Sequence, residues 1–228
     1  MVAIDQYNIS PEIIKVSKHH IEVDQIDSDA RSIIQRLNRA GFKGYIVGGF
    51  VRDSILGLKP KDCDVVTDAT PEQVNSLLPR TRIIGRRFKI VHSRSGRKIT
   101  EISTFRSSSQ RNTQKSNKGL VLRDNNYGNI EDDAFRRDFT INSLYLDIEK
   151  MEIIDFVGGF KDLQNKKLKS IGDSFERFKE DPVRILRAIR FKAKLSLDLD
   201  KKLEADMKKL SYLLKEISSG RKLSLIHI

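Results

Sequence analysis

Two aspartates separated by one residue, Asp62 and Asp64, are the first candidates for chemistry in this 228-residue chain. They begin a segment rich in β-branched residues, which predicts a strand over 62–67. Side chains two positions apart on a strand share a face, so the two carboxylates would repel unless a cation lay between them. Mg²⁺ prefers such oxygen ligands, and a pair of ions can activate a hydroxyl and steady a leaving phosphate. A solvated strand end is the alternative interpretation of this short motif.

A glycine pair, Gly48 and Gly49, precedes the aspartates and lies between a predicted strand ending at Val47 and a predicted short helix. Without side chains, backbone amides can approach a phosphate closely, and the start of a helix favours anions. Arg52 adds a positive charge that could contact the same phosphate. The combination predicts a triphosphate-binding turn, and an ordinary turn with a surface Arg52–Asp53 ion pair is the alternative.

Two further groups of polar residues lie downstream. A helix is predicted over 137–144, and it would place Asp138 and Asn142 on one face, where they could contact a ribose while Arg137 bound phosphate. The alternative is a helix start stabilised by local ion pairs.

The second group follows Pro182, a favourable first residue of a helix, with Asp181 as its predicted cap. Positions three apart then place Asp181, Arg184 and Arg187 along one side of the helix. An aspartate acceptor beside an arginine donor could read the edge of a base. An amphipathic helix with ion pairs is the alternative.

The positive charge of the chain is local. There are 43 Lys and Arg against 31 Asp and Glu, and the segment 80–123 contains thirteen of the basic residues but a single acid, Glu101. A concentrated positive field predicts binding of polyphosphate or nucleic acid, and a solvated basic face is the alternative. For Glu101, a third metal ligand, a residue that positions the primer hydroxyl and an ordinary salt bridge all stay open. The predicted RNA contacts are Arg86, Arg87, Lys89, Arg111 and Lys115.

The composition, 38% hydrophobic and 32% charged, predicts a chain with a packed core rather than a disordered one. No apolar run suggests a membrane span and no signal peptide is visible, so we expect a cytoplasmic protein without a membrane partner. The single Cys63 excludes an internal disulfide, and the four histidines lack the spacing of a zinc site.

The pattern of elements predicts an N-terminal extension over 1–27 and an α/β domain with a mixed sheet over 28–170. A helical region follows over 171–228. Within the α/β part we expect a helix starting at a Thr70 capping box and a hairpin over 87–105. A polar, basic loop is expected over 107–126.

Four ordered segments, YIVGGFVRD, KDCDVVTDATPE, RRDFTINSL and EDPVRILRAIRF, resemble the class II tRNA nucleotidyltransferase and bacterial poly(A) polymerase family. The resemblance implies a polymerase-β-like nucleotidyltransferase head with a mixed sheet and a helical neck, and the C-terminal body and tail of such proteins are expected to be missing from this sequence. It also implies that Asp62 and Asp64 are catalytic residues that bind two Mg²⁺ ions, with Mn²⁺ as an alternative, and that Asp138 is a third catalytic position. The implied nucleotide contacts are Gly48, Gly49, Arg52, Arg137, Asn142, Asp181, Arg184 and Arg187.

The segment IIGRRFKIVH over 83–92 resembles the signature of the poly(A) polymerase branch. This favours template-independent addition of AMP from ATP to the 3′ ends of mRNA or other RNA, in RNA processing and decay. A CCA-adding enzyme that acts on tRNA is the first alternative, and a non-catalytic RNA-binding module is an alternative of another class. The sequence names no RNA chaperone or decay-machinery partner.

Overall fold

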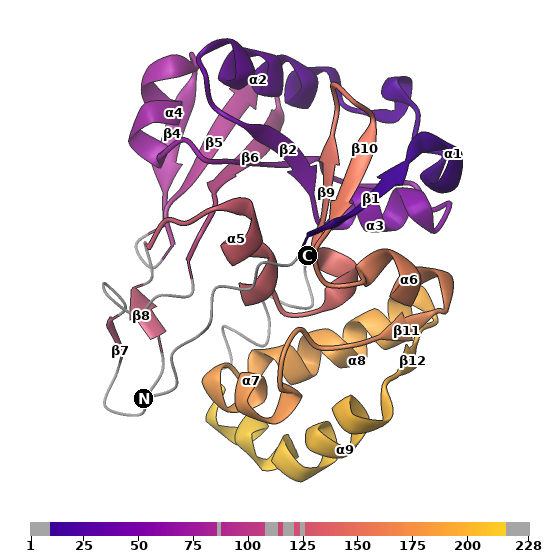
Figure 1. Ribbon diagram of the computed structural model, residues 1–228. Coiled ribbons are helices and arrows are strands. Elements are labelled where there is room, and N and C mark those ends of the chain that lie inside the picture. Colours follow the sequence, from indigo (N-terminus) through magenta and orange to yellow (C-terminus); the bar gives the residue numbers. More distant parts are fainter. Residues whose placement is uncertain (1–9, 86–87, 108–113, 116–120, 124–125, 218–228) are drawn as a thin grey trace.

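A mixed β-sheet forms the upper part of the molecule, in a computed structural model that describes residues 10–85, 88–107, 114–115, 121–123 and 126–217 (Figure 1). Strands β3 and β6 are parallel, and the other neighbours in the sheet are antiparallel. The α/β class and the mixed sheet expected from the sequence are therefore confirmed. In spatial order the strands are β1 (Glu12–Lys15), β10 (Glu152–Asp155), β9 (Leu144–Asp147), β2 (Gly44–Val47), β3 (Asp64–Thr67), β6 (Lys98–Thr104), β5 (Ile90–Ser95) and β4 (Thr81–Ile84).

The two faces of the sheet are covered by different helices, and strand alternation decides which side chain meets which. Val65 packs into the core with α2 (Ser28–Arg39), α3 (Gly49–Ile55) and α4 (Pro71–Leu77). The next residue, Val66, packs on the opposite face with α5 (Ile130–Arg136). Because side chains alternate along a strand, Asp64 shares the face of Val66, beside α5.

Two of these helices begin at side-chain caps. Thr70 accepts a hydrogen bond from the Gln73 amide, and the Gln73 side chain accepts one from the Thr70 amide, which confirms the predicted capping box. Helix α2 is capped by Asp27, whose carboxylate accepts the amides of Asp29 and Ala30.

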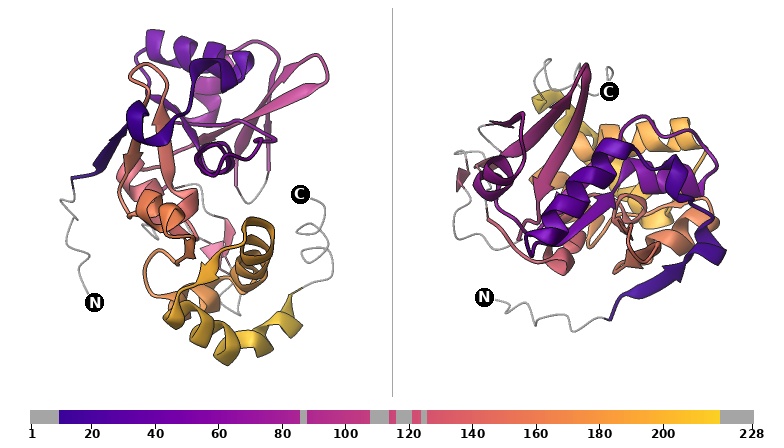
Figure 2. Two further views of the ribbon diagram at one scale, coloured as in Figure 1. Left: turned by 90° about the vertical axis from the view of Figure 1, so that its right-hand side faces the viewer. Right: turned by 90° about the horizontal axis from the view of Figure 1, so that it is seen from above.

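Helices make up most of the chain after residue 158, and they lie below the sheet (Figures 1 and 2). Phe178 of α7 and Ile185 of α8 are almost fully buried, in a core they share with α9. These elements are α6 (Gly159–Gln164), β11 (Lys167–Leu168), α7 (Ser174–Glu180), α8 (Val183–Leu195), β12 (Asp198–Leu199), α9 (Lys201–Leu210) and the 3₁₀ helix η3 (Ser211–Glu216).

The N-terminal segment is more than an extension, because β1 pairs with β10 at one edge of the sheet and buries Ile14 completely. Weak sequence patterning over 1–27 did not predict this strand, which depends on a partner far along the chain. The edge strand β4 was also not predicted. The remaining short elements are α1 (Val16–His19), η1 (Val23–Gln25), β7 (Gln114–Lys115), β8 (Val121–Arg123) and η2 (Thr140–Asn142).

The predicted helix over 137–144 is wrong. Helix α5 ends at Arg136, Phe139 is extended, and the single turn η2 precedes β9. An isolated bridge between Phe139 and Ser170 and the hydrogen bond from the Thr140 amide to the Lys169 carbonyl oxygen hold this segment against a distant part of the chain. Tertiary contacts thus override the local helical pattern. Among the described residues no helix is long and apolar enough to cross a bilayer.

Candidate active site

A cavity of about 240 Å³ opens where β2, β3 and β6 meet α5. Carboxylates and guanidinium groups both face it, so the cavity offers ligands for a cation and for an anion. Its lining residues are Val47, Gly48, Asp64, Ile90, Glu101, Ser103, Thr104, Arg106, Asp133, Arg136 and Arg137.

Asp64 lines this cavity, and its surroundings disfavour the charged form of its carboxyl group. Burial, followed by the negative charges of Glu101 and Asp62, raises its pKa to about 6, and Arg137 opposes that shift. Strand β3 begins at Asp64, so Asp62 lies just before the strand, where it is exposed. The predicted strand over 62–67 is therefore two residues too long, but the structure still brings Asp62, Asp64 and Glu101 into electrostatic contact.

Cys63, between the two aspartates, points into the core with 8% of its surface exposed. Burial and the nearby Asp64 raise the pKa of its thiol to about 12, so the sulfur stays protonated and serves as a packing group.

Asp62, Asp64 and Glu101 form an acidic corner of the cavity. This acidic corner suits a divalent cation that takes its remaining ligands from a substrate. Among the described residues, no three His, Cys, Asp or Glu side chains are grouped closely enough to hold a metal by themselves. Mg²⁺ in nucleotide sites commonly takes only one or two protein carboxylates and completes its shell with phosphates and water. Asp64, whose charge is disfavoured by burial and by its two acidic neighbours, fits this kind of site, and Asp62 offers a second carboxylate nearby.

The glycine turn lies beside the cavity. Gly48 adopts φ 75°, where a side chain would be strained, and a Cβ atom there would lie 3.9 Å from Arg137 Nη1. Arg52, by contrast, is 6% exposed and lies within a polar network. Its guanidinium donates to Asp53 Oδ1 at 2.7 Å and to Asn142 Oδ1 at 2.7 Å. The Arg52–Asp53 pair exists, but it is buried rather than a surface pair.

Asp138 and Asn142 are brought together without a helix between them. Asn142 Nδ2 donates to Asp138 Oδ1 at 3.1 Å, and Arg187 Nε of α8 donates to Asp138 Oδ2 at 2.5 Å. Burial alone would raise the pKa of Asp138, but the Arg187 charge and the hydrogen bonds from Asn142 and the Phe139 amide lower it. Asp138 is therefore a stable anion whose partner is a cation from the helical part.

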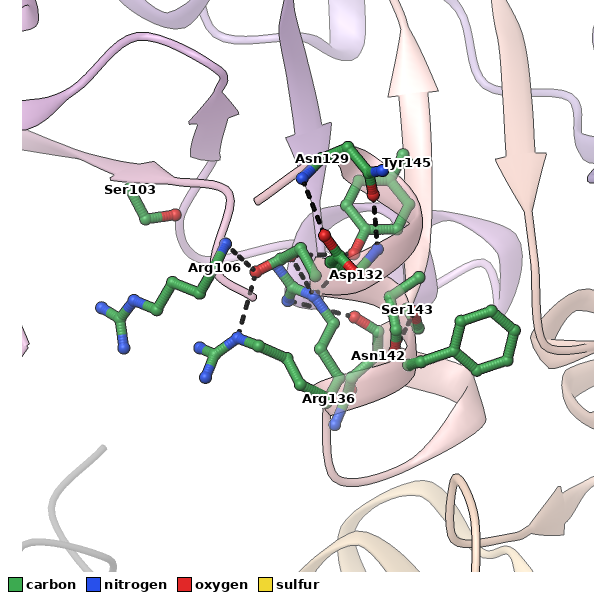
Figure 3. Close-up of polar contacts among 12 residues, drawn as sticks. Ser103, Arg106, Asn129, Asp132, Arg136, Asn142, Ser143 and Tyr145 are labelled. Carbon is green, nitrogen blue, oxygen red and sulfur yellow. Dashed lines mark hydrogen bonds and ion pairs between the residues drawn. The ribbon is translucent and has the colours of Figure 1, made fainter. Parts of the chain in front are cut away.

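Asp133 organises the basic side of the cavity, and it was not among the predicted site residues. Two of its partners, Arg136 and Tyr145, are labelled in Figure 3. It accepts hydrogen bonds from Arg137 Nη2 at 2.8 Å, from Tyr145 Oη at 2.8 Å and from Arg136 Nε at 3.4 Å. Although burial would raise its pKa, the charges of Arg137 and Arg136 hold the pKa below its usual value. The sequence signal was only the proximity of two acids to two arginines; the Tyr145 contact needs the sheet.

Arg106 is another residue that sequence analysis missed, since it was one of thirteen bases in the basic segment. Its guanidinium lies 4.5 Å from the centre of the Phe88 ring, and its amide donates to Asp133 Oδ1 at 3.3 Å. Nearby, His92 Nε2 lies 3.4 Å from Glu101 Oε1 across the β5–β6 pair. This contact is an ion pair only when His92 is protonated, so all three interpretations of Glu101 stay open.

The predicted base-reading residues lie at the start of α8. Arg184 Nη1 donates to Glu180 Oε2 and to the Arg177 carbonyl oxygen, both at 3.1 Å. Asp181 Oδ1 accepts the Val183 amide at 3.3 Å, so it stabilises the first turn as predicted, although the helix begins one residue later than expected. Arg187, predicted to lie on the same side of the helix, contacts Asp138.

Only one of the five predicted RNA contacts has a described side chain. Lys89 Nζ lies 2.7 Å from Glu72 Oε1 in an exposed ion pair. Arg86, Arg87 and Arg111 lie outside the described residues, and Lys115 belongs to β7, where the structure describes the backbone but not the side chain.

A family model described as "Poly A polymerase head domain" matches residues 44–169, which include the glycine turn, both aspartates and the Asp138–Asn142 segment. The chain belongs to this poly(A) polymerase head-domain family. It is 46% identical over 215 residues to poly(A) polymerase I of Salmonella typhimurium and 45% identical over 215 residues to that of Haemophilus influenzae. These alignments cover 92% of this chain but 46% and 48% of the relatives, so the chain spans about half their length.

CCA-adding enzymes are more distant relatives of this poly(A) polymerase head-domain chain. The enzyme of Bacillus pumilus is 37% identical over 190 residues, which is 83% of this chain and 46% of the relative. Among solved structures, the Bacillus stearothermophilus CCA-adding enzyme in complex with CTP matches with a TM-score of 0.72 and 32% identity. That match covers 85% of this chain and 46% of the other, and it confirms the nucleotidyltransferase head.

Proposed function

We propose that this chain contains the catalytic centre of a poly(A) polymerase, which transfers AMP from ATP to the 3′ end of RNA. The observation that carries the proposal is the cavity itself, where burial and acidic neighbours disfavour the charge of Asp64 on one side and Asp133 holds Arg136 and Arg137 on the other. The identity of 44–46% to poly(A) polymerase I supports ATP and RNA as the substrates. A cytoplasmic location belongs to the same proposal.

In the reaction, the RNA 3′ oxygen forms a bond to the α-phosphorus of ATP, the bond from that phosphorus to pyrophosphate breaks, and the hydroxyl proton is released. Asp62 and Asp64 would hold Mg²⁺ or Mn²⁺, which would lower the pKa of the attacking hydroxyl and stabilise the departing pyrophosphate. Arg137 faces the cavity and is kept charged by its contacts with Asp133, so it can bind phosphate. Gly48 lets the backbone approach the same group.

The rest of the nucleotide would extend toward the helical part. Asp138 and Asn142 would contact the ribose, while Asp181 and Arg184 would meet the base. Arg52 and Arg187 would act through the hydrogen bonds that fix Asn142 and Asp138. The basic residues Arg86, Arg87, Lys89, Arg111 and Lys115 would guide the RNA by phosphate contacts.

CCA addition is the second candidate, because the matched solved structures include CCA-adding enzymes. One was solved with CTP and another, from Thermotoga maritima, with tRNA. The latter matches with a TM-score of 0.69 and 27% identity over 92% of this chain and 48% of the other. Higher identity to poly(A) polymerase I favours the first candidate.

The test supplies one labelled nucleotide at a time, with Mg²⁺, to a generic RNA and to a tRNA that lacks its terminal CCA. Long tails of A on the generic RNA support poly(A) addition, and ordered C, C and A on the tRNA support the second candidate. Asp62→Ala is expected to abolish incorporation while RNA binding persists, whereas the control Asp24→Ala, at an exposed site, should behave as wild type. RNA binding without any extension would overturn both and support a non-catalytic module.

A further inference from the structure

Phe191 of α8 lies at the contact between the helical part and the site. The Arg52 guanidinium lies over its ring, 5.0 Å from the centroid, and the Arg187 guanidinium lies 5.5 Å from it. The ring also meets Phe139 edge to face, with centroids 5.8 Å apart and an interplanar angle of 84°. Cations favour the negative face of an aromatic ring, so this one side chain orients two arginines.

The two arginines over the ring each hold one of the predicted ribose contacts. Arg52 Nη1 donates to Asn142 Oδ1 at 2.7 Å, and Arg187 Nε donates to Asp138 Oδ2 at 2.5 Å. Asn142 Nδ2 donates to Asp138 Oδ1 at 3.1 Å, so Phe191, the two arginines and these two residues form one continuous network of contacts. The position of α8 is thereby tied to the geometry of Asp138 and Asn142.

The same helix begins beside the predicted base contacts, Asp181 and Arg184, two turns before Phe191. A nucleotide bound by both groups has a fixed distance between its base and its ribose. Any shift of α8 relative to Asp138 would therefore change which base fits, and misplacement by about 1 Å can reduce a rate roughly a hundredfold.

We propose that Phe191 is a positioning residue for nucleotide selection, which sets the offset between the base-reading start of α8 and the ribose-binding pair Asp138–Asn142. The proposal rests on the proposed function, because it assumes that one nucleotide contacts both groups. It assigns the role to the aromatic face, since packing volume alone would not orient the two guanidinium groups.

Three substitutions distinguish the effect of the aromatic face of Phe191 from the effect of its packing volume. Phe191→Leu keeps an apolar side chain but removes the ring, Phe191→Tyr keeps the ring, and Ile189→Ala changes a residue on the same helix that is 50% exposed. Calorimetry with MgATP and with MgCTP would measure affinity, and extension of a generic RNA would give kcat and KM for each nucleotide. Circular dichroism and thermal melts would verify that each variant is folded.

Phe191→Leu is expected to reduce the preference between ATP and CTP at least fivefold and to lower kcat/KM for the preferred nucleotide about tenfold or more. Phe191→Tyr should restore both to within about twofold of wild type, and Ile189→Ala should change neither. A folded Phe191→Leu protein that discriminates as wild type does, or a Phe191→Tyr protein as impaired as Phe191→Leu, would overturn the proposal. If wild type binds nucleotides selectively but extends no RNA, the proposed function fails while the calorimetric comparison still tests Phe191.

Discussion

Asp64 and Asp138 are both predicted catalytic aspartates, yet their surroundings shift their pKa values in opposite directions. Burial and the negative charges of Glu101 and Asp62 raise the pKa of Asp64 to about 6. Asp138 is also removed from water, but Arg187, Asn142 and the Phe139 amide lower its pKa. Residue type alone therefore does not define the role of an aspartate in this site.

The difference separates a carboxylate that needs a cation from one that already has one. At Asp64 the charge of Arg137 offsets only part of the unfavourable surroundings, so a positive group that enters would stabilise the carboxylate, as a metal ion does. At Asp138 the protein supplies the cation from α8, so the residue connects the helical part to the head domain. In the proposed site, Asp64 at the start of β3 would bind the ion, and Asp138 beside η2 would couple the helical part to the head domain.

The largest effect is expected from Asp64→Asn, which keeps the shape of the side chain and removes its charge. Incorporation should fall by roughly a thousandfold or more, because metal stabilisation of the transition state contributes several kcal/mol. Primer extension under saturating ATP and RNA measures this loss. An Asp64→Asn protein within tenfold of wild type would remove the metal-binding role from Asp64.

The second-largest effect should be a pH dependence of the stability of the metal-free protein, which comes from the raised pKa of Asp64. Between about pH 4 and pH 6 the Asp64 carboxyl ionises more readily in the unfolded chain than in the folded one, so the contribution of Asp64 to the free energy of unfolding decreases as the pH rises. A pKa change from 3.8 to about 6 corresponds to about 2 to 3 kcal/mol, and this contribution is constant above the higher value. Urea unfolding in EDTA at several pH values would measure it.

Asp64→Asn should remove this part of the pH dependence and make the metal-free protein more stable than wild type at pH 7. Mg²⁺ should stabilise wild type and have little effect on the variant, because binding to the folded state alone raises stability. Equal pH profiles for the two proteins would contradict the assigned repulsion.

Asp138→Asn is expected to lower the stability of the protein, whereas Asp64→Asn raises it, and the change should be smaller. Loss of the charge leaves the Arg187 guanidinium without its ionic partner, and the free energy of unfolding at pH 7 should fall by about 1 to 2 kcal/mol. The estimate is modest because the Arg187 side chain is 38% exposed, so water screens part of the interaction. Urea denaturation compares the variants with wild type. If Asp138→Asn were more stable than wild type, the Arg187 pair would not stabilise the protein, and Asp138 would not differ from Asp64 in this respect.

The smallest effect should come from Glu101→Gln. Removing one of the two acidic neighbours lowers the pKa of Asp64, but the Glu101 side chain is 53% exposed, so the change should be less than about one unit. The pH range over which stability decreases should move toward acid by that amount. No movement would show that Glu101 does not contribute to the raised pKa of Asp64.

The sequence predicted those parts of the site whose geometry is local. The spacing of Asp62 and Asp64, the glycine turn and the Thr70 capping box depend on neighbours in the chain, and the structure places each next to the element expected for it. Ordered motifs then indicated the family, which the head-domain match confirms.

Contacts between distant segments could not be predicted in the same way. The network around Asp133 requires α5 to lie against β9, where Tyr145 points back to the helix. Arg187 contacts Asp138, which lies 49 positions earlier in the chain, whereas the local spacing grouped Arg187 with Asp181 and Arg184 on one side of a helix. The helix predicted over 137–144 failed because the Phe139–Ser170 bridge outweighs the local pattern.

The order of strands in the sheet has a consequence for synthesis of the chain on the ribosome. Asp64 and Glu101 lie on β3 and β6, which pair directly and are complete once residue 104 has been made. The arginines of the cavity and the closing pair of β1 with β10 come later, since β1 joins a strand roughly 140 residues downstream. During translation, which proceeds from the N-terminus, the acidic corner therefore emerges before its guanidinium neighbours, and the nascent domain depends on residues up to 155 to complete its sheet.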